Sequence, residues 1–90
     1  MEEVKFFAYI RDYTKCKETK IENEETVEKL LLRLSDIYGD QFRKRIFSGS
    51  ELSKEIIILV NGRHIVHLNG INTKLKSGDT VSIFPVVAGG

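Results

Sequence analysis

The sequence is poor in the residues that crosslink a chain, hold metals or span membranes. It contains one cysteine, one proline and no tryptophan. A single cysteine, Cys16, excludes an internal disulfide and a metal site with several cysteine ligands. The longest apolar run, residues 56–60, is far shorter than the roughly 20 residues that a membrane-spanning helix needs. We therefore expect neither a disulfide scaffold nor a membrane partner.

An excess of charge of either sign is also missing. The chain has 14 Lys and Arg residues against 13 Asp and Glu residues, which gives a formal net charge of +1. A general nucleic-acid binder usually has a broad basic face, so this balance argues against a nucleic-acid partner. Residues 1–5 lack the apolar stretch of a secretory signal, which predicts a cytoplasmic protein.

The length sets a further limit. Ninety residues, 41% of them hydrophobic and 30% charged, are typical of one folded domain. A domain of this size buries only about 60–65% of the surface of its unfolded chain. Little room remains for a deep pocket lined by catalytic groups. We expect a protein that is not an enzyme in its own right.

Two segments near the start have the alternating pattern of β-strands. In residues 4–10, the alternation places Val4, Phe6 and Ala8 on the side that faces the core. After a predicted turn, residues 17–22 have the charged character of an edge strand. We expect these two strands to pair as a hairpin.

The clearest helix signal follows. Thr26 is a suitable N-cap, and Gly39 suits the C-terminal end of a helix. The predicted apolar stripe consists of Val27, Leu30, Leu31, Leu34, Ile37 and Tyr38. A shorter pattern with Phe42, Ile46 and Phe47 predicts a helical turn that packs against the main body.

Three more strands are predicted at residues 56–60, 65–68 and 80–84, the first of them ended by an Asn-Gly hairpin turn. This order of elements predicts an α+β fold, in which one main helix packs on one face of a mixed sheet. That architecture is the β-grasp, with the first and last strands as neighbours. We expect a β-grasp domain at residues 1–84 and a flexible C-terminal tail at residues 85–90, ending in Gly-Gly.

One helix covers one face of such a sheet, so the other face meets solvent or a partner. The outward positions are Phe7, Tyr9, Ile57, Leu59 and Phe84. Large apolar side chains gathered on an exposed face are typical of a docking surface. We predict that Phe7, Tyr9, Leu59 and Phe84 bind a partner protein. The alternative is that residues 40–54 fold over part of them.

The tail follows Pro85, which ends regular strand pairing because it has no N–H donor. The remaining tail residues are Val86, Val87, Ala88, Gly89 and Gly90. Glycine has no Cβ, so such an end can enter a narrow channel and present its carboxylate. A partner enzyme can activate that carboxylate as an acyl-adenylate. Gly90 with Gly89 is therefore the predicted reactive site and residues 85–88 are predicted partner contacts, whereas the alternative is a frayed terminus without function.

Four motifs, spread over nearly the whole chain, match a known pattern. They are residues 4–11 (VKFFAYIR), 60–62 (VNG), 75–81 (LKSGDTV) and 84–90 (FPVVAGG). Together they resemble the MoaD-type sulfur carriers, the small subunits of molybdopterin synthase, within the ubiquitin-like ThiS/MoaD superfamily. That family usually has a second proline where this chain has Val86.

The resemblance implies a carrier cycle in which partners supply all the catalytic groups. A MoeB-type adenylyltransferase, similar to ubiquitin-activating enzymes, would adenylate Gly90 with ATP and magnesium, and a sulfur donor would convert the adenylate to a thiocarboxylate. The tail would then enter the MoaE-type large subunit of molybdopterin synthase and give its sulfur to a pterin precursor of the molybdenum or tungsten cofactor. No cofactor bound to this chain itself is implied.

Other functions stay open at this point. A ubiquitin-like protein modifier shares the fold, the tail and the activation step, but its Gly90 ends on a substrate lysine. Sulfur delivery to thiamine synthesis or tRNA thiolation is a third function, and RNA binding through the basic residues 43–45 is a fourth. His64 and His67 are expected on opposite faces of a strand, and Cys16 is expected to be an ordinary thiol, so none of them predicts a metal or nucleophilic site.

Overall fold

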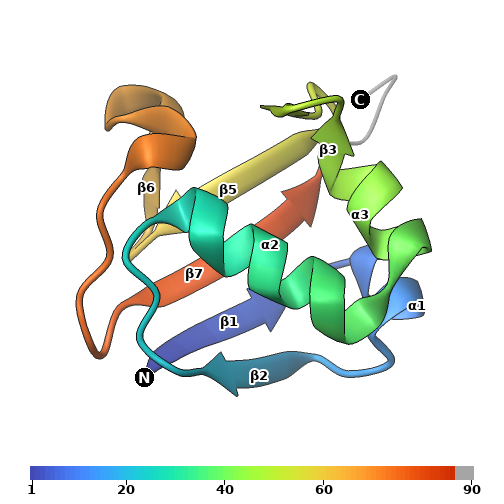
Figure 1. The fold of residues 1–90 in the computed structure, drawn as a ribbon, viewed down its shortest axis with the longest axis horizontal. Helices are drawn as coiled ribbons and strands as arrows, with labels where there is room; N and C mark the ends of the chain where they lie inside the picture. Colours follow the sequence, from blue (N-terminus) through green and yellow to red (C-terminus); the bar gives the residue numbers. More distant parts are fainter. Residues whose placement is uncertain (87–90) are drawn as a thin grey trace.

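The computed structural model describes residues 1–86, in which helix α2 crosses one face of a mixed sheet (Figure 1). The five strands of the sheet are, in spatial order, β2 (Glu18–Ile21), β1 (Glu2–Phe6), β7 (Thr80–Pro85), β5 (Ile56–Val60) and β6 (Arg63–His64). The helices are α1 (Ile10–Thr14), α2 (Val27–Tyr38) and α3 (Asp40–Ile46), with the short 3-10 helices η1 (Ile65–His67) and η2 (Gly70–Asn72). A separate small hairpin consists of β3 (Phe47–Ser48) and β4 (Glu51–Leu52).

β1 and β7 are parallel neighbours inside the sheet. Val4 pairs with Val81 in this register. β5 runs antiparallel to β7 on its other side, with Ile57 opposite Phe84. β2 runs antiparallel to β1, as the predicted hairpin requires. The arrangement is the predicted β-grasp, with the first and last strands adjacent.

The core lies between the sheet and α2. Its fully buried members on these elements are Val4, Phe6, Ile58, Val81 and Ile83 from the sheet and Val27, Leu30, Leu31 and Leu34 from α2. Phe42 and Ile46 of α3 are also fully buried, which confirms the short helical pattern predicted there. α3 lies beside α2 in the helical layer, so it leaves the opposite face of the sheet uncovered (Figure 1).

α2 begins and ends at the predicted residues. The Thr26 hydroxyl accepts a hydrogen bond from the Lys29 N–H at 3.2 Å, and Gly39 ends the helix with a φ of 95°. Ile37 is 54% exposed, although its spacing predicted burial. It lies in the last turn of α2 beside Lys20 and Ile21 of the edge strand β2, where the described sheet stops.

The first strand is shorter than predicted. β1 ends at Phe6, and Ala8 adopts a φ of 51°, which a continuing strand cannot accommodate. The Ile10 N–H then donates to the Phe7 carbonyl at 3.2 Å, and α1 follows where a turn was expected. Ala8 is exposed rather than buried, and Tyr9 leaves the sheet altogether.

The strand predicted at residues 65–68 is also wrong. The predicted hairpin turn is confirmed, with positive φ at Asn61 and Gly62, but the returning strand β6 ends after two residues. The His64 Nδ1 accepts the Val66 N–H at 3.1 Å and so caps η1 instead. Among residues 1–86, no helix is long and apolar enough to cross a membrane.

Candidate functional site

The face of the sheet opposite α2 has a cluster of apolar side chains at one end. The rings of Phe7 and Phe84 are stacked, with centroids 4.2 Å apart and planes within 10°. Ile57 lies directly opposite Phe84 across the β5–β7 ladder, and Leu59 follows on the same face of β5. We call these four residues, all half-buried, the aromatic patch. The predicted outward placement of all four is confirmed.

β-Strand alternation explains why this patch forms. Val81 and Ile83 point into the core, so Phe84 must point the other way. The Phe7 N–H donates to the Ile83 carbonyl at 3.1 Å, which extends the β1–β7 pairing by one residue and brings the two rings together. The Arg11 guanidinium lies 5.7 Å from the centroid of the Phe7 ring. A cation over an aromatic face adds a polar edge to the patch.

The chain leaves the sheet directly beside the aromatic patch. Pro85 is buried and pairs with Ile56 as the last residue of β7. The Val86 N–H donates to the Glu55 carbonyl at 2.7 Å, and the Val86 side chain is 42% exposed. We call Glu55, Pro85 and Val86 the tail root. The predicted site residues Val87, Ala88, Gly89 and Gly90 lie outside the described residues.

Tyr9, which was predicted to belong to the aromatic patch, lies elsewhere. It follows the left-handed Ala8 and packs against Arg45 of α3, with the guanidinium carbon 5.3 Å from its ring centroid. The same guanidinium lies 5.7 Å from the Tyr13 ring and donates to the Tyr13 hydroxyl from Nε at 3.3 Å and Nη2 at 3.1 Å. Its Nη1 reaches Glu55 at 3.5 Å. We call Tyr9, Tyr13 and Arg45 the arginine sandwich.

The arginine sandwich was not predicted from the sequence. The sequence predicts only a basic run at residues 43–45, because nothing in that run indicates which of its side chains contacts an aromatic ring. The hydrogen bond to Tyr13, followed by the interaction with the charge that Tyr13 can acquire, raises the pKa of Arg45 further above its ordinary range. Arg45 is therefore a permanent cation that is fixed in place close to the tail root.

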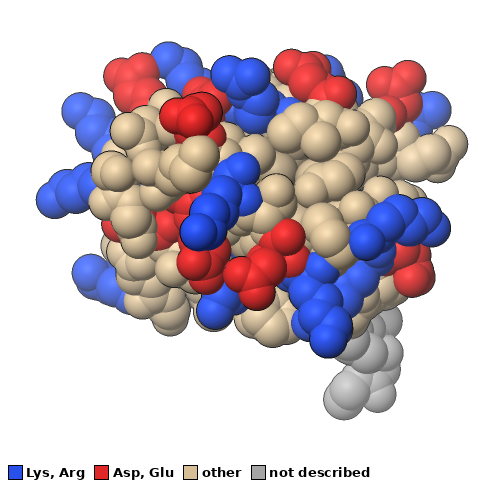
Figure 2. All heavy atoms as spheres, turned by 90° about the horizontal axis from the view of Figure 1, so that it is seen from below, with Lys and Arg blue, Asp and Glu red and all other residues tan. Residues whose placement is uncertain are grey.

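Charges of both signs are mixed on the face of the molecule that Figure 2 shows. Figure 2 shows Lys and Arg side chains interspersed with Asp and Glu side chains on the face seen from below. A polynucleotide would need a continuous basic stripe. The face in Figure 2 offers none.

The remaining candidate groups have structural contacts. The Cys16 Sγ lies 3.5 Å from the Tyr38 hydroxyl, and both residues are half-buried. Desolvation, reinforced by this hydrogen bond, raises the pKa of Tyr38 to about 12. The rings of His64 and His67 meet edge-on at 6.0 Å, so their predicted placement on opposite faces is wrong. A 3-10 helix brings residues three apart to the same side. Within residues 1–86, no three His, Cys, Asp or Glu side chains form a group that could hold a metal.

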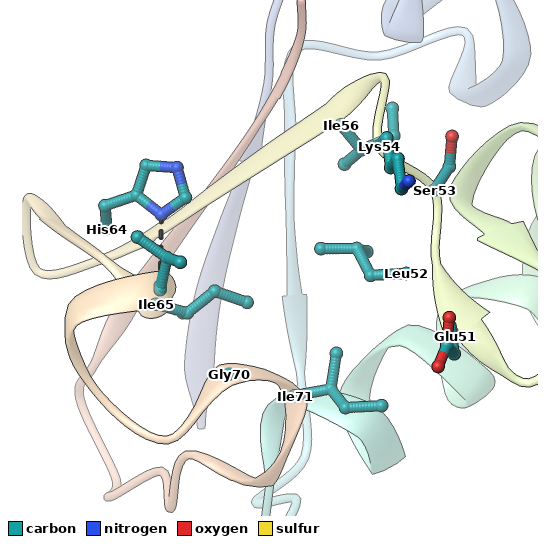
Figure 3. Close-up of a pocket in the computed structure, with 10 residues that line it drawn as sticks. Glu51, Leu52, Ser53, Lys54, Ile56, His64, Ile65, Gly70 and Ile71 are labelled. Carbon is teal, nitrogen blue, oxygen red and sulfur yellow. Dashed lines mark hydrogen bonds between the residues drawn. The ribbon is translucent and has the colours of Figure 1, made fainter.

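A hollow lies at the outer edge of β5, away from the aromatic patch. It has a volume of about 450 Å³ and is open to solvent. In Figure 3, Leu52, Ile56, Ile65 and Ile71 point into it from β4, β5, η1 and η2. This hollow was not predicted from the sequence, because its walls come from four separate segments. Its lining is mainly aliphatic and gathers no set of reactive groups.

The chain is similar to known proteins over nearly its whole length. The model of the ThiS family matches residues 4–90. Small archaeal modifier protein 3 of Haloferax volcanii is 38% identical over 90 residues, covering 98% of this chain and 97% of that protein. An Archaeoglobus fulgidus protein, named as an inferred sulfur carrier, is 46% identical over 65 residues. The match covers 72% of this chain and 74% of that protein. The solution structure of small archaeal modifier protein 1 from Methanosarcina acetivorans has a TM-score of 0.88 at 35% identity, covering 99% and 95%.

Proposed function

The chain belongs to the ThiS family of small ubiquitin-like sulfur carriers and modifiers, and we propose that it is the sulfur-carrying small subunit of a molybdopterin synthase. The observation that best supports a carrier is the position of the aromatic patch. The stacked Phe7 and Phe84 rings lie next to the tail root, so a partner that grips the patch also receives the start of the tail. A carrier needs a rigid docking surface next to its reactive C-terminus.

The proposed chemistry takes place at the Gly90 carboxylate. One carboxylate oxygen attacks the α-phosphorus of ATP in a MoeB-type partner, and pyrophosphate leaves with magnesium. Hydrosulfide supplied by a sulfur donor then attacks the acyl carbon and displaces AMP, and loss of the sulfur-bound proton leaves a thiocarboxylate. A MoaE-type large subunit receives this sulfur for a pterin substrate. The chain itself contributes the nucleophilic end and the docking surface, and the partners contribute the catalytic side chains, the ATP and the magnesium.

The aromatic patch suits this role because its apolar area is accessible without being essential to the core. Its four side chains are half-buried, whereas their neighbours Phe6, Ile58 and Ile83 are fully buried. Aromatic residues are enriched at the centres of protein interfaces. We propose that Phe7, Leu59 and Phe84 bind the body of each partner while residues 85–88 line its channel.

The decisive experiment is coexpression of the full chain with a cognate activating enzyme and its sulfur donor, followed by intact mass spectrometry. We expect a mass shift of one oxygen-to-sulfur exchange, located at Gly90 by fragmentation. A variant that lacks Gly90 is the matched control and should show no shift. Transfer of this sulfur to a pterin by a purified large subunit tests the molybdopterin assignment. A thiocarboxylate that no such subunit consumes would assign the carrier to another sulfur pathway.

A second function is favoured by the names of two relatives, both small archaeal modifier proteins. In this function the adenylated Gly90 is transferred to a substrate lysine, with formation of an isopeptide bond and release of AMP. Proteolysis of cell extracts followed by mass spectrometry should then find lysines that bear the C-terminal residues of this chain. Lysine conjugates without any thiocarboxylate would replace the carrier function, and both products together would establish a dual role.

A further inference from the structure

We propose that the arginine sandwich is a second docking contact, which binds carboxylates on the rim of the channel through which the activating partner admits the tail. The proposal rests on the proposed function only in its activation step. That step is common to the carrier and the modifier, so the contact is expected in either case. The partner surface is defined by its chemistry: an acidic rim around an opening that takes an extended chain.

Contacts within the chain already hold the Arg45 side chain in place. Its guanidinium lies over the Tyr9 ring at 5.3 Å and the Tyr13 ring at 5.7 Å, and two of its nitrogens donate to the Tyr13 hydroxyl. A free arginine side chain loses considerable rotamer entropy when it binds, whereas one already held by two rings and two hydrogen bonds loses less. The side chain is still 38% exposed, so part of the guanidinium can be reached by a partner.

Arg45 also lies close to the point where the tail leaves the sheet. The carbonyl of Glu55 accepts the Val86 N–H, and the carboxylate of the same residue lies 3.5 Å from Arg45. Arg45 therefore lies immediately beside the tail root. Tyr9, two residues after Phe7, connects the sandwich to the aromatic patch along the chain. A channel that receives the tail must place its rim against these groups.

The positive charge and the shape of the Arg45 guanidinium suit a carboxylate on a partner. The guanidinium is a planar donor that matches a carboxylate in two parallel hydrogen bonds. Glu55 is its acidic neighbour, but that ion pair is long and both side chains are well solvated. Exposed pairs of this kind are weak, so a carboxylate on a partner can displace Glu55 at little cost.

The test measures adenylation of the full chain by its activating enzyme as ATP–pyrophosphate exchange at low and high salt. Arg45→Glu should raise KM about tenfold or more at low salt with little change in kcat, because a docking contact acts before the chemical step. Arg45→Lys should lie between wild type and Arg45→Glu, since a lysine keeps the charge but loses the fork. Lys44→Glu is the matched control, with the same charge reversal one residue away, and should stay within about twofold of wild type.

Each outcome discriminates. Equal KM values for Arg45→Glu and Lys44→Glu would overturn the proposal, because they would show that only the total charge of this surface matters. An unchanged KM for Arg45→Glu would show that Arg45 makes no contact with the partner and would also overturn it. If Arg45→Glu lowers the thermal midpoint, Arg45→Gln replaces it, because glutamine removes the positive charge without adding a negative one. The KM of Arg45→Gln should also rise. Failure of the wild type to be adenylated would overturn the proposed function as well. Adenylation that is sensitive to Arg45 without thiocarboxylate formation would support the docking contact and reject the carrier.

Discussion

Tyr38 contacts the apolar core with its ring and a polar partner with its hydroxyl. Its ring packs edge-on against Phe6 with centroids 5.6 Å apart and tilts against Phe42 at the same distance. Its hydroxyl extends to the Cys16 Sγ at 3.5 Å. The ring therefore closes the end of the core, and the hydroxyl gives the half-buried thiol a polar partner.

We expect one phenol of the native protein to ionise near pH 12, because desolvation and the Cys16 hydrogen bond raise the pKa of Tyr38 to about 12. The unfolded chain loses this proton near pH 10. Between the two values the native state keeps a proton that the unfolded state has lost. This contribution to stability is therefore complete below pH 10 and falls as the pH rises toward 12.

Tyrosinate absorbance measured during an alkaline titration checks this expectation. Tyr38→Phe should remove the late phase and leave the other two phenols. Cys16→Ala should move the late phase to lower pH, since it removes one of the causes of the raised pKa. A late phase that persists in Tyr38→Phe would show that another phenol is the source.

Phe6 and Phe7 are adjacent in the sequence and face opposite sides of the molecule, which makes them a matched pair. Phe6 is fully buried, so Phe6→Ala should lower the free energy of unfolding by about 3–5 kcal/mol. Phe7 is half-buried and stacked on Phe84, so Phe7→Ala should lower it by only about 1 kcal/mol. Urea denaturation measures both values.

Phe7→Asp should weaken binding to the activating enzyme far more than it lowers the free energy of unfolding. A loss of stability as large as that of Phe6→Ala would make Phe7 a core residue.

At the scale of elements, helices and strands with a periodic apolar pattern were predictable from the sequence. Short elements that depend on a single backbone conformation or a single side-chain cap were not. α2 follows from its repeating apolar stripe and its Thr26 cap, and β1 and β7 follow from alternation. α1 was missed because residues 4–10 alternate smoothly, and only the left-handed Ala8 breaks the strand. η1 was missed because its cap is the His64 side chain, a residue without a strong capping preference. The aromatic patch was predictable from alternation, whereas the arginine sandwich depends on the packing of α1 against α3.

Gly39 connects α2 to α3 and is the sharpest test at this scale. Its φ of 95° and ψ of −176° lie in a region that is essentially restricted to glycine. A Cβ added there would meet no atom within 4 Å, so any cost comes from the backbone alone. Gly39→Ala should lower the free energy of unfolding by about 1–3 kcal/mol, measured by urea denaturation.

Gly49, in the β3–β4 hairpin, is the control for this substitution. A Cβ added at Gly49 would also meet nothing within 4 Å, but its φ of 65° lies where other residues are found at a cost of about 1 kcal/mol. Gly49→Ala should therefore cost less than Gly39→Ala. Equal costs would mean that the α2–α3 connection relaxes and that its backbone is not restricted to glycine.

At the scale of the whole molecule, rigid docking and chemical reaction are assigned to different parts of the chain. β1, β5 and β7 fix the aromatic patch, and the ladder reaches as far as Val86. α1 and α3, at the same end of the sheet, fix the arginine sandwich (Figure 1). The proposed reactive carboxylate lies four residues beyond the last described residue. Changes at the end of the chain should therefore alter function without altering the fold.

Removal of Gly90, or addition of one residue after it, tests this separation. Both variants keep every contact described for residues 1–86, so the thermal midpoint should match that of the wild type within error. Both should still bind the activating enzyme with nearly the wild-type Kd, because the aromatic patch and the arginine sandwich are intact. Neither should form a thiocarboxylate or a lysine conjugate. In both variants the carboxylate is displaced from the reacting phosphorus by the length of one residue, about 3.3–3.6 Å. Reaction requires alignment of the two atoms within about 1 Å. Activity that survives both changes would refute every function that depends on Gly90, and lost binding would show that the end of the chain itself contributes to docking.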